Sequence, residues 1–157
     1  MSSELKITNL KHASSSSNNL VLASDGGVTI KGDDFDGAWT DYYSSSTVTG
    51  WSSLTSGRNV IYYKKLGTLI SVFFALEGTS NATTVSFTMP YAFITTTYPS
   101  FNGGPVWCYD NGSADSALGY VRMVSKSSQV NVYRASGTWT SSGTKIGTGS
   151  FTYPTTT

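Results

Sequence analysis

Apolar and polar residues alternate with a period of two along most of the chain after residue 59. The clearest case is LISVFFALEG, residues 69–78, where four apolar side chains fall on one face of an extended strand. The opposite face carries Leu69 and Phe73, which predicts a central strand that is covered on both sides. The residues expected to point into the domain's own core are Ile70, Val72, Phe74 and Leu76.

Further segments repeat this alternation, are rich in β-branched and aromatic residues, and are separated by turns of Gly, Ser and Asn. In TVSFTMP, the apolar residues Val85, Phe87 and Met89 should point inward, and Pro90 should end the strand. No segment has sustained helical periodicity. We therefore expect an all-β fold, an antiparallel β-sandwich or jelly-roll-like knob that spans residues 51–157. The expected strands are residues 59–65, 69–78, 84–90, 104–112, 117–125, 128–135 and 143–154.

The first 32 residues carry much less apolar material. Residues 20–30, LVLASDGGVTI, predict a small hairpin across Asp25-Gly26-Gly27. An isolated hairpin is marginally stable at best, so this segment needs a partner, either copies of itself around a threefold axis or another protein. We expect residues 1–32 to be an extended or hairpin anchor. Its apolar residues are Leu5, Ile7, Leu10, Leu20, Leu22, Val28 and Ile30.

Residues 33–50 predict a neck between the anchor and the knob, because they hold four of the nine acidic residues and no clear strand pattern. Asp33, Asp34 and Asp36 do not have EF-hand spacing, since Gly37 follows Asp36 directly, so no metal site is predicted. Aromatic residues crowd the neck, and such residues are enriched at subunit interfaces. The residues expected in a subunit contact are Trp39, Tyr42, Tyr43, Trp51, Leu69 and Phe73.

Composition and charge exclude several classes of partner. Charged residues make up 12% of the chain, about half the usual share of roughly 25%. The net charge is +1 and no basic run is longer than Lys64-Lys65, so the electrostatic footprint of a nucleic-acid-binding protein is missing. No apolar stretch approaches the roughly 20 residues of a membrane span. The single cysteine, Cys108, allows neither an intrachain disulfide nor a thiolate-rich metal site, and no cofactor is predicted.

The sequence also contains few residues that could form a catalytic site. The one histidine, His12, lies in the Ser-rich opening segment, away from the knob. The carboxylates available for a glycosidase pair in the knob are Glu77, Asp110 and Asp115, and the last two flank a loop in which turn formation alone explains Asp. The sequence therefore predicts a protein that is not an enzyme.

Aromatic residues near loops are the best candidates for ligand binding. Sugars stack on Trp and Tyr rings while Asp, Asn and Arg hydrogen-bond their hydroxyls, as in other sites that combine aromatic walls with a few polar groups. Two loops combine these types and should form a distal glycan-binding tip. In the alternative interpretation, Trp107 and Tyr109 are core or interface residues. The six candidates are Trp107, Tyr109, Asp110, Asn111, Arg134 and Trp139.

Two groups of motifs resemble virion proteins of tailed bacteriophages. HASSSSNNLVL followed by DGGVTI (within residues 12–30) resembles a module of tail-fibre proteins. GWSSLTSGRNVIYYKKLGTLISVFFALEGTS, VSFTMPY and GTGSFTYPT occur in the order found in fibre tip domains. The resemblance implies a homotrimer at the virion surface, attached through its N-terminus to another virion protein and facing host glycan.

The chain has no long shaft, which leaves a short spike, a fibre tip or a capsid head fibre as the expected component. The alternatives are a capsid decoration protein, a polysaccharide-degrading spike and a cellular lectin-like module.

Overall fold

The computed structural model describes residues 38–94, 100–135 and 137–156, together with the short strands β1 (Asn9–Leu10), β2 (Leu20–Leu22) and β3 (Val28–Ile30). These three strands form an antiparallel sheet in the order β1-β2-β3. Pairing of Leu20 with Ile30 and of Leu22 with Val28 confirms the expected hairpin strands. The Asp25-Gly26-Gly27 turn and the anchor residues Leu5 and Ile7 lie outside the described residues.

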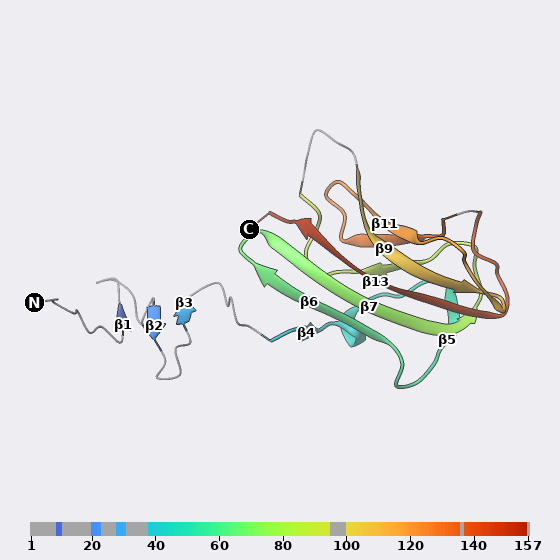
Figure 1. The fold of residues 1–157 in the computed structure, drawn as a ribbon, viewed down its shortest axis with the longest axis horizontal. Helices are drawn as coiled ribbons and strands as arrows, with labels where there is room; N and C mark the ends of the chain where they lie inside the picture. Colours follow the sequence, from blue (N-terminus) through green and yellow to red (C-terminus); the bar gives the residue numbers. More distant parts are fainter. Residues whose placement is uncertain are drawn as a thin grey trace, which may run out of the picture.

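A second, larger sheet is entirely antiparallel and has the order β4-β6-β7-β13-β9-β11-β12-β8, with β5 also paired to β7 and β10 to β9. Figure 1 shows its long strands β6, β7, β13 and β9 side by side. A single 3-10 turn, η1 (Tyr43–Ser45), follows β4. The strands are β4 (Thr40–Asp41), β5 (Trp51–Leu54), β6 (Val60–Leu66), β7 (Leu69–Ser80), β8 (Ser86–Thr88), β9 (Ser100–Asp110), β10 (Ser113–Ala114), β11 (Gly119–Val124), β12 (Gln129–Tyr133) and β13 (Thr144–Pro154).

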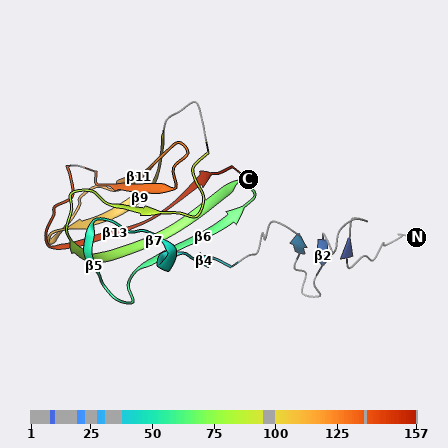
Figure 2. The same ribbon diagram turned by 180° about the vertical axis from the view of Figure 1, so that it is seen from behind.

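This large sheet curls so that β8, at one end of the strand order, comes close to the segment that leads into β5. β8, at the end of the strand order, bridges through Ser86 to Thr49, just before β5, and β5 pairs in turn with the C-terminal part of β7. The view from behind shows the curl, with β11 on one side and β6 and β7 on the other (Figure 2). The all-β expectation is thus confirmed as an antiparallel, sandwich-like sheet folded on itself.

The core fills the inside of the curl and follows the alternation seen in the sequence. All four inward residues expected on β7 are fully buried, and Val85, Phe87 and Met89 are buried with them. The rings of Phe74 and Phe87 meet across the interior with centroids 4.9 Å apart. Each such ring contributes about 1.5–3 kcal/mol by leaving water, so burial of alternate residues fixes which face of each strand turns outward.

Part of the expected neck belongs to the large sheet. Thr40 and Asp41 pair with Tyr63 and Tyr62 of β6, and the half-buried Tyr42 and Tyr43 pack against the core. Trp51 is only 8% exposed, and its Nε1 donates to the carbonyl of Lys145 at 3.1 Å. The assignment of Trp51 to a subunit contact is therefore wrong, because its ring is buried in the core of the domain.

Candidate functional site

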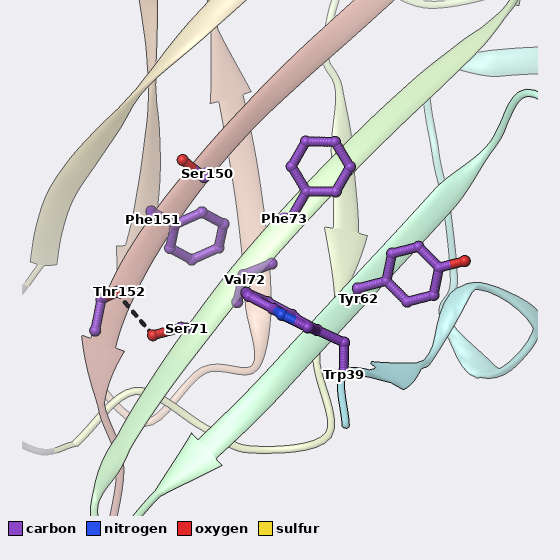
Figure 3. A pocket seen from close by; sticks show the side chains of 8 residues that line it. All are labelled: Trp39, Tyr62, Ser71, Val72, Phe73, Ser150, Phe151 and Thr152. Carbon is purple, nitrogen blue, oxygen red and sulfur yellow. Dashed lines mark hydrogen bonds between the residues drawn. The ribbon is translucent and has the colours of Figure 1, made fainter. Parts of the chain in front are cut away.

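An open groove of about 690 Å³ lies on the outer face of β6, β7 and β13. Figure 3 shows how its lining residues are arranged. The Trp39 ring reaches across β6 toward β7, and the rings of Tyr62 and Phe73 rise beside it. The remaining lining residues are Ser71, Val72, Ser150, Phe151 and Thr152.

Strand register brings these residues together. Tyr62 on β6 lies opposite Phe73 on β7, and Phe73 lies opposite Ser150 on β13. Because side chains alternate across a strand, residues two positions apart share a face, so Ser71 and its partner Thr152 lie beside this row. Trp39 lies directly before β4 and adds its ring to the lining of the groove.

The groove combines aromatic rings with hydroxyl groups. Trp39 is 48% exposed and Phe73 40% exposed, large values for aromatic residues that the fold holds in place. The hydroxyls of Ser71 and Thr152 are hydrogen-bonded to each other at 3.2 Å. None of the eight lining side chains is charged. Such a surface suits a neutral ligand that has both apolar faces and hydroxyl groups.

The two loops expected to form a glycan-binding tip do meet, near the Thr144 end of β13. They meet through an ion-pair network. Arg134 donates to Asp110 at 2.7 Å and forms a bidentate pair with Asp115. Asp110 is 4% exposed and also accepts hydrogen bonds from the backbone N–H and the hydroxyl of Thr140. These side chains already satisfy one another, so their function here is to join loops.

Trp139 is part of the same network and is only 3% exposed. Its Nε1 donates to the carbonyl of Val132 at 2.9 Å, and Arg134 lies 5.8 Å from its ring centroid. The assignment of Trp139 and Asp110 to sugar contacts is thus wrong, because neither offers an exposed group. The cavity beside Trp139 measures about 140 Å³, below the roughly 300–1,000 Å³ of typical ligand sites.

The other ligand candidates do not converge on one place. Trp107 is 43% exposed on the outer face of β9, where its ring lies 6.2 Å from that of the half-buried Tyr109. Asn111 is exposed in the turn after β9, in the left-handed conformation with φ of 48°. These three candidates remain accessible or partly so, but they belong neither to the groove nor to the ion-pair network.

Lys145 lies fully buried in a cage between two tryptophans, a feature that the sequence analysis missed. Its Nζ lies 5.6 Å from the Trp51 ring centroid and 5.3 Å from that of Trp139. The ammonium donates to the carbonyls of Gly50 and Ala82 at 3.1 and 2.7 Å. Burial lowers its pKa to about 8, although the nearby charge of Asp110 opposes this shift.

We expect Lys145 to make the folded state more stable as the pH rises from 8 to 9. In this window the unfolded chain, with a lysine pKa of about 10.4, still holds the proton that the folded chain has released, so Lys145 should add about 1 kcal/mol to the free energy of unfolding relative to a variant that lacks this lysine. Urea unfolding at pH 7, 8 and 9 measures this, with Lys145→Met as the variant that lacks the rise. Cys108 and Tyr153 act in the opposite direction in both proteins, because burial raises the pKa of Cys108 to about 11 and also raises that of Tyr153. The unfolded thiol, with a pKa of about 8.5, begins to lose its proton within the same window, so the comparison with Lys145→Met isolates the lysine.

A wild-type curve parallel to that of Lys145→Met between pH 8 and 9 would contradict this assignment.

The carboxylates considered for catalysis are all paired with arginine. Glu77 accepts from Arg58 at 3.1 Å through both oxygens, and Asp110 and Asp115 accept from Arg134. His12 lies outside the described residues. Among the residues that the structure describes, no cluster of His, Cys, Asp and Glu could hold a metal ion, and no helix is long and apolar enough to cross a membrane.

Outward-facing tyrosines were the main residues that sequence reasoning overlooked. Tyr62 lines the groove, and Tyr120 and Tyr133 stack on the outer face of β11 and β12 with ring centroids 5.1 Å apart. A signal for them was present, because each lies one position from a buried apolar residue on a strand that the alternation predicts.

Comparison with known proteins adds no family, since no family model, curated protein or solved structure matches the chain.

Proposed function

We propose that the protein is a non-enzymatic structural component of the surface of a tailed-phage virion. In this proposal it is a homotrimer whose N-terminal strands hold the assembly together and attach it to another virion protein. The large β-domain is displayed outward, toward the host. The resemblance of the HASSSSNNLVL and DGGVTI motifs and of the knob segments to fibre proteins supports this function.

One structural observation carries the proposal. Strands β1, β2 and β3 are two or three residues long and pair with each other in a sheet of their own. A sheet with so little material to bury is not stable alone in water. Copies of the same segment, or a partner protein, would supply the missing contacts, as in a fibre built from several chains.

Deleting residues 1–32 should convert the trimer to a monomer that keeps its fold. The large sheet has its own buried core, so the truncated chain should unfold cooperatively while its molar mass drops to that of one chain. Light scattering coupled to size-exclusion chromatography measures the mass, with three times the 16.7 kDa chain mass expected for the full protein.

A matched control is the replacement of Ser14 to Ser17 by glycine, which leaves the anchor's apolar residues in place and should keep the trimer. The proposal fails if the full chain is monomeric. It also fails if the truncated chain remains trimeric, or if that chain is still incorporated into virions when it replaces the full protein.

A further inference from the structure

We propose that the groove formed by Trp39, Tyr62 and Phe73 is a binding site for a neutral saccharide. This inference deepens the proposed function, since it rests on the β-domain facing the host, and it names both the site and the chemical class of its ligand. Sugars were expected at the loops that carry Asp110 and Trp139. The geometry points instead to the outer face of β6, β7 and β13.

Size and shape distinguish the groove from the cavity beside Trp139. At about 690 Å³ the groove falls within the roughly 300–1,000 Å³ of typical ligand sites, whereas the cavity beside Trp139 does not. The groove is open to solvent, so a saccharide can lie in it as part of a longer chain.

The lining chemistry matches that of a pyranose ring. One face of many pyranoses presents C–H groups, which pack on aromatic rings, while the rim presents hydroxyls. Trp39, Tyr62 and Phe73 supply rings from three segments of the chain. Ser71, Ser150 and Thr152 supply hydroxyls along the floor that can donate and accept. The absence of charge among these eight lining residues favours a neutral sugar over a uronate or a phosphorylated one.

A second copy of the chain is the competing occupant, because Trp39, Leu69 and Phe73 were expected in a subunit contact and all three are exposed. The floor of the groove argues against it. Serine is depleted at the cores of protein–protein interfaces, yet Ser71 and Ser150 line this site. Each would be desolvated by an apolar partner surface without gaining a new hydrogen bond, which costs free energy.

The test is a calorimetric titration of the full-length protein with three neutral oligosaccharides: maltohexaose, cellohexaose and mannohexaose. We expect at least one to bind with a Kd of about 1 mM or below. Trp39→Ala and Phe73→Ala should each weaken that binding about tenfold, because each removes one stacking ring. Trp107→Ala is the matched control, since it removes an equally exposed ring on β9 outside the groove, and it should leave the Kd unchanged.

Ser150→Trp provides an independent check that removes no lining ring. Ser150 is exposed, so its replacement by Trp should fill the groove and abolish saccharide binding while the domain stays folded. The proposal is overturned if none of the three sugars binds at about 10 mM, or if binding survives the Trp39, Phe73 and Ser150 variants.

Molar mass separates this inference from the assembly proposal. A fall in mass for Phe73→Ala would show that the groove is a subunit contact and would overturn the saccharide site. The mass of the chain truncated after residue 32 tests the trimer without reference to the groove. Either proposal can therefore fail while the other stands.

Discussion

Asp110→Ala is expected to lower the free energy of unfolding by about 3–5 kcal/mol, the range for breaking a buried ion pair by removing one partner. Asp110 accepts three hydrogen bonds, from Arg134 and from the backbone N–H and hydroxyl of Thr140. Alanine would leave the Thr140 N–H without its acceptor and would remove one of the two carboxylates that neutralise Arg134. Urea unfolding at pH 7 measures the loss.

Asp41→Ala is the matched control for this prediction. Asp41 is exposed, and its carboxylate accepts one hydrogen bond, from the backbone N–H of Tyr43 at 3.0 Å. Its removal should cost about 1 kcal/mol or less. Equal losses in the two variants would show that the buried network at the loop end does not hold the loops together.

Gly104→Ala is expected to destabilise the domain by about 2–5 kcal/mol, the sum of a backbone cost and an overpacking cost. Gly104 has φ of +60°, and a Cβ there would lie 2.4 Å from the carbonyl oxygen of Ser150 and 2.6 Å from Cβ of Phe151. Both neighbours belong to the β13 segment under the groove, so the variant should also weaken saccharide binding. Thermal and urea unfolding measure the first effect, and calorimetry the second.

Gly57→Ala isolates the backbone cost alone. Gly57 also has positive φ, +73°, but a Cβ added there would meet nothing within 4 Å. We expect a loss of about 1–2 kcal/mol, the cost of placing an L-residue in the left-handed region. If Gly104→Ala lowers the free energy of unfolding no more than Gly57→Ala does, the close approach of β9 to β13 does not contribute to the cost of the Gly104 substitution.

The sequence predicted strands well wherever alternate residues are buried. In β7 the pattern identified all four buried apolar residues, and in the segment before Pro90 all three. It missed β4, because a two-residue strand with both side chains exposed leaves no apolar periodicity to detect. It missed the burial of Lys145 because lysine is almost never fully buried unless its charge is compensated, and the compensating carbonyls and rings come from distant segments.

Only part of the groove could be predicted from the sequence. Leu66 pairs with Leu69 across the Gly67-Thr68 turn, and this short turn sets the register that places Tyr62 opposite Phe73. A hairpin of this kind can be recognised from local sequence. The pairing of Phe73 with Ser150 joins strands far apart in the chain, and no local pattern specifies which outward residue of β13 will lie there.

The bridge from Thr49 to Ser86 has a consequence for crowded assemblies. An exposed strand edge offers unpaired N–H and C=O groups to any neighbouring chain, and such edges start aggregation. Thr49 hydrogen-bonds Ser86 on the outer side of β8 in both directions, through backbone groups 2.8 and 3.2 Å apart. At the other end of the strand order, β4 offers only two residues. Among the described residues the Thr49 bridge therefore shortens the edge of β8 that is open to strand addition, which should lower the tendency of domains held at high local concentration to polymerise.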